Sequence, residues 1–299
     1  MSNKDILEQY IKELKLDYIT PVEKHNSMYF KRDDLYQPFE DIPLSGGKVR
    51  QCLSLLAIKQ QYIKDNCDNL VVTGTGVTSP QGIIVTRSAK YFGINSCIFV
   101  GNTKPESIRK NTLMMNILYQ GGHINYESKQ GYETCLNAVI KRTFPNAYHI
   151  SFGLNAPEVP EAILWSTANQ VQNIPDELDY LIVPCGSCIM LSGILLGIKK
   201  YNKQVKNVIG IQIAGYDRTK VIQGLINENL PYKLLLSKDY PYSKHLKSSV
   251  DGIELDPLYE AKAYDYMTKY MLDDISNKKT LFWIVGNSNP VRNKIWKNM

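Results

Sequence analysis

The sequence predicts an α/β fold of two open, twisted and mostly parallel sheets flanked by helices. Strand-like and helix-like segments alternate over most of the 299 residues, as they do in repeated β-α-β units. The strand-like segments carry unbroken apolar runs, as in "DYLIVPCG" (179–186). Such strands are buried on both faces and pair in parallel. The length and the 43% share of apolar residues suffice for one large or two ordinary domains without a disulfide or metal staple.

The first group of elements predicts a small α/β domain over residues 51–150. Runs of β-branched and apolar residues predict strands at 69–76, 95–101 and 147–152. Apolar residues at helical spacing predict helices at 81–93, 105–122 and 131–144. The first of these helices closes on Gly93, and the second opens with Pro105 and stops at two glycines.

The remaining elements predict a large domain formed by residues 1–50 together with 151–299. Strands are expected at 179–186, 207–215 and 279–286, and helices at 158–172, 190–201 and 257–272. The stretch 226–250 is polar, irregular and rich in Tyr and Lys, which predicts a loop or lid.

Glycine-bearing turns follow several predicted strands, namely "TGTGVTSPQG", "SFGLN", "CGSCIMLSG" and "VGNSN". Ligands of open α/β sheets bind at the carboxyl ends of the strands, so these turns are candidate site segments. Neither a P-loop nor a full G-x-G-x-x-G is present. Lys48 stands behind two glycines and ahead of a predicted helix in "LSGGKVRQCLSLL" (44–56). Taken alone, it reads as a surface lysine in a turn or as a lysine that reaches a buried partner.

The charge and the cysteines of the sequence limit which cellular compartment and which binding partners are expected. The net charge is +6 with scattered lysines, densest in the final "VRNKIWKNM", which is either a solvated tail or a contact with nucleic acid or an acidic partner. Cys185 and Cys188 form a single C-x-x-C with no second pair or histidine at zinc spacing, so no metal site is predicted, while a redox role stays open. No apolar run reaches the about 20 residues of a membrane span, and no signal peptide is recognisable. We therefore expect a cytoplasmic protein.

Two segments carry a specific resemblance to a known family. "YFKRDDLYQPFEDIPLSGGKVRQCLSLL" (29–56) and "LDPLYEAKAYDYM" (255–267) resemble motifs of the D-cysteine desulfhydrase and 1-aminocyclopropane-1-carboxylate deaminase family. The glycine turns follow the same order along nearly the whole chain. The resemblance implies fold type II, like the tryptophan synthase β subunit, with pyridoxal 5'-phosphate as cofactor, an amino-acid substrate and a homodimer.

The resemblance also implies roles for three residues. Lys48 would hold the cofactor as a Schiff base. A partly desolvated lysine has a lowered pKa, so it can act first as nucleophile and then as general base. Ser79 matches the serine of the family's Ser-Asn-His turn, which receives the substrate carboxylate. Tyr259 either faces the substrate or packs on the core.

The chain departs from the family at the cofactor contacts. Pro80 and Gln81 replace the Asn and His of that turn, and Gln81 is a candidate ring contact. Val285 replaces the Thr that meets the pyridine nitrogen, for which Asn287 and Ser288 are candidate substitutes. The phosphate loop is expected at Gly186, Ser187, Cys188, Ile189 and Met190. The backbone N–H groups of Ile189 and Met190 remain available if both side chains point away.

Three functions follow as hypotheses. The first is a pyridoxal-phosphate enzyme that acts on an amino acid by β-elimination or deamination. The second is a binding relative that has lost catalysis, which the altered phosphate loop favours and the retained Lys48 opposes. The third is a pyridoxal-phosphate enzyme that acts on an amino acid attached to a nucleotide or nucleic acid, which the basic charge and the irregular 226–250 stretch permit.

Overall fold

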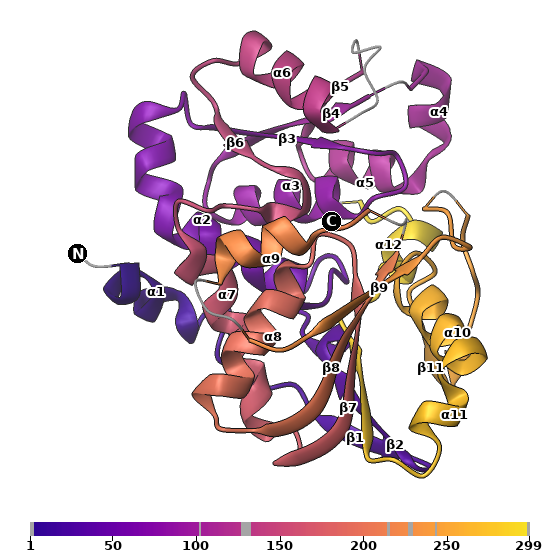
Figure 1. Cartoon of the computed structure of the whole chain (residues 1–299). Helices are drawn as coiled ribbons and strands as arrows, with labels where there is room; N and C mark the ends of the chain where they lie inside the picture. Colours follow the sequence, from indigo (N-terminus) through magenta and orange to yellow (C-terminus); the bar gives the residue numbers. More distant parts are fainter. Residues whose placement is uncertain are drawn as a thin grey trace.

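Two mostly parallel sheets organise the chain, as predicted (Figure 1). The computed structural model describes residues 3–101, 103–126, 133–213, 216–226, 230–242 and 244–297. The small sheet has the order β5-β4-β3-β6, and all its neighbours are parallel. Its strands are β3 (Leu70–Thr75), β4 (Asn95–Val100), β5 (His123–Asn125) and β6 (Tyr148–Ile150). The helices around it are α3 (Gln81–Tyr91), α4 (Pro105–Lys110), α5 (Thr112–Tyr119) and α6 (Glu133–Thr143).

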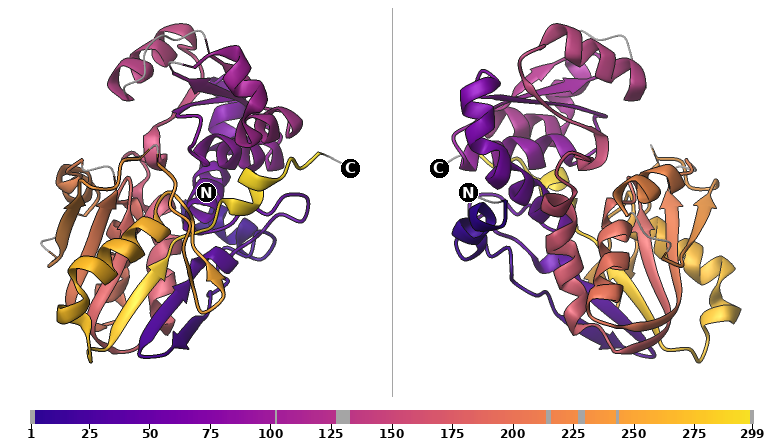
Figure 2. Two further views of the ribbon diagram at one scale, coloured as in Figure 1. Left: turned by 90° about the vertical axis from the view of Figure 1, so that its right-hand side faces the viewer. Right: turned by 60° about the vertical axis from the view of Figure 1, so that its left-hand side comes forward.

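The large sheet has the order β1-β2-β12-β7-β8-β9, and only the β1–β2 pair is antiparallel. Its strands are β1 (Val22–His25), β2 (Met28–Arg32), β7 (Glu177–Cys185), β8 (Gln204–Ile213), β9 (Lys233–Ser237) and β12 (Thr280–Ile284). Helices α7 (Pro160–Asn169), α8 (Ile189–Lys200) and α9 (Thr219–Leu225) lie on one side of it. Helices α10 (Glu260–Tyr270) and α11 (Leu272–Ile275) lie on the other (Figure 2).

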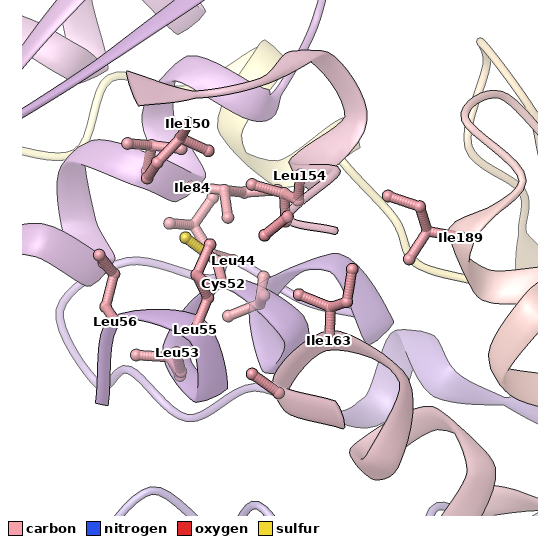
Figure 3. Packing of buried hydrophobic residues seen from close by; sticks show 14 of the residues in the cluster. Leu44, Cys52, Leu53, Leu55, Leu56, Ile84, Ile150, Leu154, Ile163 and Ile189 are labelled. Carbon is pink, nitrogen blue, oxygen red and sulfur yellow. The ribbon is translucent and has the colours of Figure 1, made fainter. Parts of the chain in front are cut away.

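Helix α2 (Gly47–Asn66) lies at the junction of the two sheets. Most of its first twelve residues are buried, because it packs against both α3 and α7. Residues from both parts of the chain join in one apolar cluster around it, including Leu53, Ile84 and Ile163 (Figure 3). The two sheets therefore share a continuous core. The domain boundaries at residues 50 and 150 stay a prediction.

Short elements complete the fold. They are α1 (Asn3–Ile11), the 3-10 turns Asp33–Leu35, Phe152–Leu154 and Gln170–Asn173, the hairpin β10 (Ser249–Val250) and β11 (Ile253–Glu254), and α12 (Asn289–Asn293). Within the part of the chain that the structure describes, no helix has the length and apolar character needed to cross a membrane.

The structure differs from the predicted elements in a few places. The helix expected at 105–122 is two helices, because the Asn111 side chain accepts the N–H of Met114 and starts a new helix there. The loop expected at 226–250 contains strand β9, which forms an edge of the large sheet. Strands β1, β2 and β5 were not predicted. Parts of the predicted segments 131–144, 207–215 and 226–250 lie outside the described residues.

Candidate active site

Lys48 lies in the first turn of α2 and lines a cavity between the two sheets. Gly46, with a φ of 100°, turns the chain into the helix, and the N–H of Gly47 donates to the carbonyl of Val285 at 2.9 Å. Burial lowers the pKa of Lys48 to about 8, although Cys52 and Asp256 oppose the shift. A lysine with this pKa has a substantial neutral fraction near neutral pH and can act as a nucleophile.

A buried charged network braces the start of α2. Asp33 accepts hydrogen bonds from Arg50 at 3.2 Å, from the Thr20 hydroxyl at 3.0 Å and from the Trp283 indole at 3.0 Å. Asp33 and Arg50 have no exposed side-chain surface, and the Arg50 guanidinium lies 4.1 Å from the Tyr36 ring centroid. The Lys-Arg-Asp-Asp-Leu motif therefore contributes Asp33 to the support of the lysine-bearing helix. None of its residues lines the cavity.

The turn between β7 and α8 places a helix N-terminus beside the same cavity. Gly186, Ser187, Cys188 and Met190 line the cavity. The first N–H groups of α8 have no partner within the helix, so they are available to an anion. Cys188 adopts a left-handed φ of 64°, a conformation that glycine adopts more readily.

The two long side chains at the start of α8 lie in different places. Ile189 is buried in the apolar core (Figure 3). The Met190 sulfur lies 3.1 Å from the Gln51 amide nitrogen, and the Met190 side chain covers Gly47. Ile189 is therefore turned into the core, whereas Met190, which also lines the cavity, covers the start of α2.

Glu260, which no sequence pattern singled out, lines the same cavity and has an unpaired side-chain oxygen. Its Oε1 accepts the Gly286 N–H at 3.0 Å, whereas Oε2 is buried and has no partner among the described residues. Burial, and then the nearby Asp256 carboxylate, raise the pKa of Glu260 well above its usual value. A buried carboxyl with an unsatisfied oxygen is costly and fits a ligand group that shares a proton with it. Its only sequence signal was its place directly after Tyr259 in the quoted motif.

Asn287 and Ser288 line the cavity, but their side chains are already engaged. The Asn287 amide donates to the Glu254 carbonyl at 3.1 Å, and its oxygen accepts the Asn289 N–H at 2.9 Å. The Ser288 hydroxyl donates to Asp256 and accepts from Arg292. Val285 offers no side-chain polar group. Glu260 is therefore a better placed candidate for a ring nitrogen than either residue expected from the sequence.

The turn at 79–81 presents few polar groups to the cavity. Pro80 lines the cavity, whereas Ser79 and Gln81 do not. The Gln81 amide nitrogen donates to Thr73 and Ser151, and its oxygen accepts the Gly153 N–H at 2.7 Å. Gln81 thus ties β3 to the segment after β6, and its side chain has no free group for the ring contact that the sequence suggested.

Tyr259 lines the cavity, and its ring covers Gly186, where an added Cβ would stand 2.7 Å from it. Its hydroxyl belongs to a small network, because Tyr242 forms side-chain hydrogen bonds with both Tyr259 and Ser79. Burial raises the pKa of Tyr259 well above 10, so the phenol stays protonated. Ser79 and Tyr259 are thereby connected, although only Tyr259 reaches the cavity.

Cys185 and Cys188 are buried free thiols. The hydrogen bond between Cys185 and Cys188, together with burial, raises the pKa of Cys185, and the Cys188 thiol donates to the Gln212 amide oxygen at 3.0 Å. A thiol with a raised pKa is a poor nucleophile. Among the described residues, no three His, Cys, Asp or Glu side chains gather as a metal site.

Comparisons with known proteins agree with this geometry. The family model described as pyridoxal-phosphate dependent enzyme matches residues 13–272. A curated relative, the O-seryl-dTMP PLP-dependent decarboxylase of Salmonella phage ViI, is 25% identical over 94% of this chain and 83% of its own length.

Solved structures share the fold over nearly the whole chain. An ACC deaminase homologue has a TM-score of 0.73 at 20% identity and covers 96% of both chains. Threonine deaminase isoform 2 from Solanum lycopersicum has a TM-score of 0.64 at 12% identity and covers 96% of this chain and 90% of its own. Maize serine racemase has a TM-score of 0.61 at 15% identity, with 95% and 93% covered.

Proposed function

This chain belongs to the pyridoxal-phosphate dependent enzymes of fold type II, and from that premise we propose that it removes the α-carboxylate of an amino acid whose side chain is joined to a nucleotide. Pyridoxal phosphate supplies, when bound, an electron sink for the charge that bond cleavage leaves on Cα. The specific reaction and substrate are the proposal; the cofactor and an amino-acid substrate follow from the family.

The residues that line the cavity fit the cofactor. Lys48 would hold it covalently, and the free N–H groups at the start of α8 would receive its phosphate. The unpaired Oε2 of Glu260 would meet the ring nitrogen. Because burial raises the pKa of Glu260, a proton shared between this residue and the ring would be favoured. Lys48 lines the same cavity and would be the group that returns a proton to Cα.

The main support for decarboxylation is the surroundings of the position expected for the substrate carboxylate. The family resemblance assigns the carboxylate to the turn at 79–81. There the Ser79 N–H donates to the Gly76 carbonyl, the Gln81 N–H donates to the Ser79 hydroxyl at 3.3 Å, and Pro80 has no N–H. The neighbouring cavity wall is apolar, with Leu44, Ile84 and Val291. A carboxylate with few donors in an apolar wall is destabilised relative to neutral carbon dioxide, which favours its loss.

The phage relative supports the substrate class. Its name states that it decarboxylates O-seryl-dTMP. A decarboxylase needs a free α-carboxylate, so the serine of that substrate is joined to the nucleotide through its side-chain oxygen. We propose the same class of substrate for this chain, namely an amino acid that carries a deoxynucleotide on its side chain.

β-Elimination or deamination, the outcome predicted from the sequence, is the second candidate. It requires a base that removes the Cα proton, and Lys48, with a pKa of about 8, is such a base. On a serine joined through its oxygen, elimination would expel the nucleotide, whereas decarboxylation would leave the link intact. The two outcomes therefore give different products from one substrate.

One experiment separates these candidates. The purified enzyme, loaded with pyridoxal phosphate, is given serine joined through its oxygen to a thymidine nucleotide, with an isotope label in the carboxyl carbon. Labelled carbon dioxide and a nucleotide that retains an amine are expected. Release of ammonia and free nucleotide without carbon dioxide would show that the enzyme catalyses elimination and not decarboxylation. The absence of any product from loaded enzyme would favour a binding relative. The Lys48→Ala variant is the control for uncatalysed loss.

A further inference from the structure

A second and larger hollow opens next to the candidate active site. It measures about 640 Å³, within the size of pockets that hold small ligands. We name it the polar basin and define it by six of its lining residues, Thr78, Lys110, His245, Lys247, Asn289 and Arg292. None of the roles proposed above for Lys48, Glu260 or the start of α8 uses the polar basin.

The polar basin and the active-site cavity share their walls. Three segments, 78–80, 254–260 and 285–293, contribute residues to both. Thr78 lines the basin and Pro80 the cavity, while Asn289 lines the basin and Ser288 the cavity. A molecule bound with its reactive end at Lys48 can therefore extend into the basin.

The charge of the basin is positive. Lys110, Lys247 and Arg292 line it, and among the residues that the structure describes Glu254 is the one acidic lining residue. Lys110 and Lys247 are exposed and form no hydrogen bond or ion pair with any residue in the described ranges. Two cations without protein partners on one concave wall attract an anion.

Arg292 is fixed in place at the border of the two hollows. Its Nε donates to the Ser288 hydroxyl at 2.6 Å, and its Nη2 donates to the Thr78 carbonyl at 2.7 Å. Within the described part of the chain its Nη1 pairs with no residue, so it remains able to donate to a phosphate oxygen. The guanidinium is thus positioned by neutral groups and keeps its charge for a ligand.

We propose that the polar basin binds the phosphate of a deoxynucleotide carried by the substrate, through Lys110, Lys247 and Arg292. The inference rests on the proposed function, because it places the nucleotide portion of that substrate while the amino-acid portion lies at Lys48. Phosphate is the part of a nucleotide that such cations recognise most strongly. A free amino acid would leave the basin unused.

The test measures binding to the loaded enzyme without turnover. The probes are dTMP and a short single strand of oligodeoxythymidylate, followed by calorimetry and fluorescence anisotropy. Lys110→Glu and Lys247→Glu are each expected to weaken binding about fivefold or more and to lower the salt slope for the strand by about one. Lys64→Glu is the matched control. Lys64 is an exposed lysine in the last turn of α2, about 24 Å along the helix from Lys48, so its reversal should leave binding unchanged.

The two probes distinguish a single nucleotide from a DNA strand. Equal affinity for both indicates a free nucleotide, and tighter, more salt-sensitive binding of the strand indicates nucleic acid. Both results support the basin as the phosphate site. The proposal would be overturned if neither probe binds the wild-type enzyme, or if the wild type and both charge-reversal variants bind the probes equally well.

A kinetic comparison separates failure of this inference from failure of the proposed function. If the probes bind as expected but the nucleotide-linked serine yields no product, the proposed reaction is wrong and the basin stands. If the enzyme turns over that substrate but neither reversal raises its KM, the reaction stands and the basin assignment is wrong.

Discussion

Gly46 and Val285 touch through their backbones, so that a Cβ added to Gly46 would stand 2.4 Å from the Val285 carbonyl oxygen. The φ of Gly46 is +100°, where an L side chain is strained. We expect Gly46→Ala to lower the free energy of unfolding by about 3 kcal/mol or more and to displace Lys48. Urea unfolding measures the first effect, and cofactor absorbance the second.

Gly224→Ala is the matched control for this substitution. Gly224 lies in α9, and an added Cβ would meet nothing within 4 Å. Alanine favours a helix by about 1 kcal/mol over glycine, so this variant should be as stable as the wild type or more so. A Gly46→Ala variant of equal stability would contradict the contact.

The buried network under α2 predicts a large loss of stability for Asp33→Ala. This change leaves Arg50 buried without its carboxylate partner, which costs about 3–5 kcal/mol. Asp17→Ala, at an exposed position, should change the free energy of unfolding by less than about 0.5 kcal/mol. Equal unfolding midpoints for the two variants would show that Asp33 is not required as a brace.

The pKa of Lys48 predicts how covalent attachment of pyridoxal phosphate depends on pH. Only the neutral amine attacks the cofactor aldehyde, and burial lowers this pKa from 10.5 to about 8. The attachment rate should therefore rise about tenfold per pH unit up to about pH 8 and then level. Borohydride trapping followed by peptide mass spectrometry measures the rate. A rate that keeps rising to pH 10 would contradict the lowered pKa. The Lys48→Ala variant is the control, because any attachment to it occurs at other lysines.

Glu260 predicts a separation between cofactor binding and turnover. In Glu260→Gln the amide oxygen can still accept the Gly286 N–H, but the side chain could not exchange a proton with the ring as the proposed function requires. We expect kcat to fall by about 100-fold or more with less than about a tenfold change in cofactor affinity. Glu260→Ala removes both contacts and should also weaken the loop at Gly286. Full activity in Glu260→Gln would exclude a role for this proton.

Pro80 predicts a change in reaction outcome. Pro80→Asn places an amide donor at the expected carboxylate position and should tighten binding of the amino acid while slowing release of carbon dioxide, because it stabilises the carboxylate. Pro80→Ala removes the ring without adding a side-chain donor, so it serves as the control. Faster carbon dioxide release in Pro80→Asn would contradict the proposed origin of decarboxylation.

The site residues that the sequence predicted lie in local motifs. Lys48 was identified from two glycines, a following helix and the family resemblance, and the loop at 186–190 from the turn after a strand. Ile189 is buried in the core whereas Met190 lines the cavity, so the expectation that both side chains leave the loop backbone free for a phosphate stays a prediction. Glycine turns and helix starts are determined by nearby residues, so sequence reveals them.

Other features depend on contacts between distant segments. Gln81 bonds to Thr73, Ser151 and Gly153, which no local pattern could reveal. Glu260 was missed because a helical glutamate usually faces solvent, and only the tertiary fold buries it. Strand β9 was missed for a similar reason, since it is a partly exposed edge strand whose pairing with β8 decides its conformation.

The neighbouring positions of β2 and β12 in the large sheet have a consequence for biosynthesis. The hydrogen bond between Asp33 and Trp283 joins residues 250 positions apart, so a growing polypeptide cannot complete the support of Lys48 until its last strand has left the ribosome. Contacts of this span slow folding and leave apolar surface exposed meanwhile. Cofactor capture should thus be a property of the finished chain, and ribosome-bound nascent chains that stop before β12 should acquire no colour from pyridoxal phosphate.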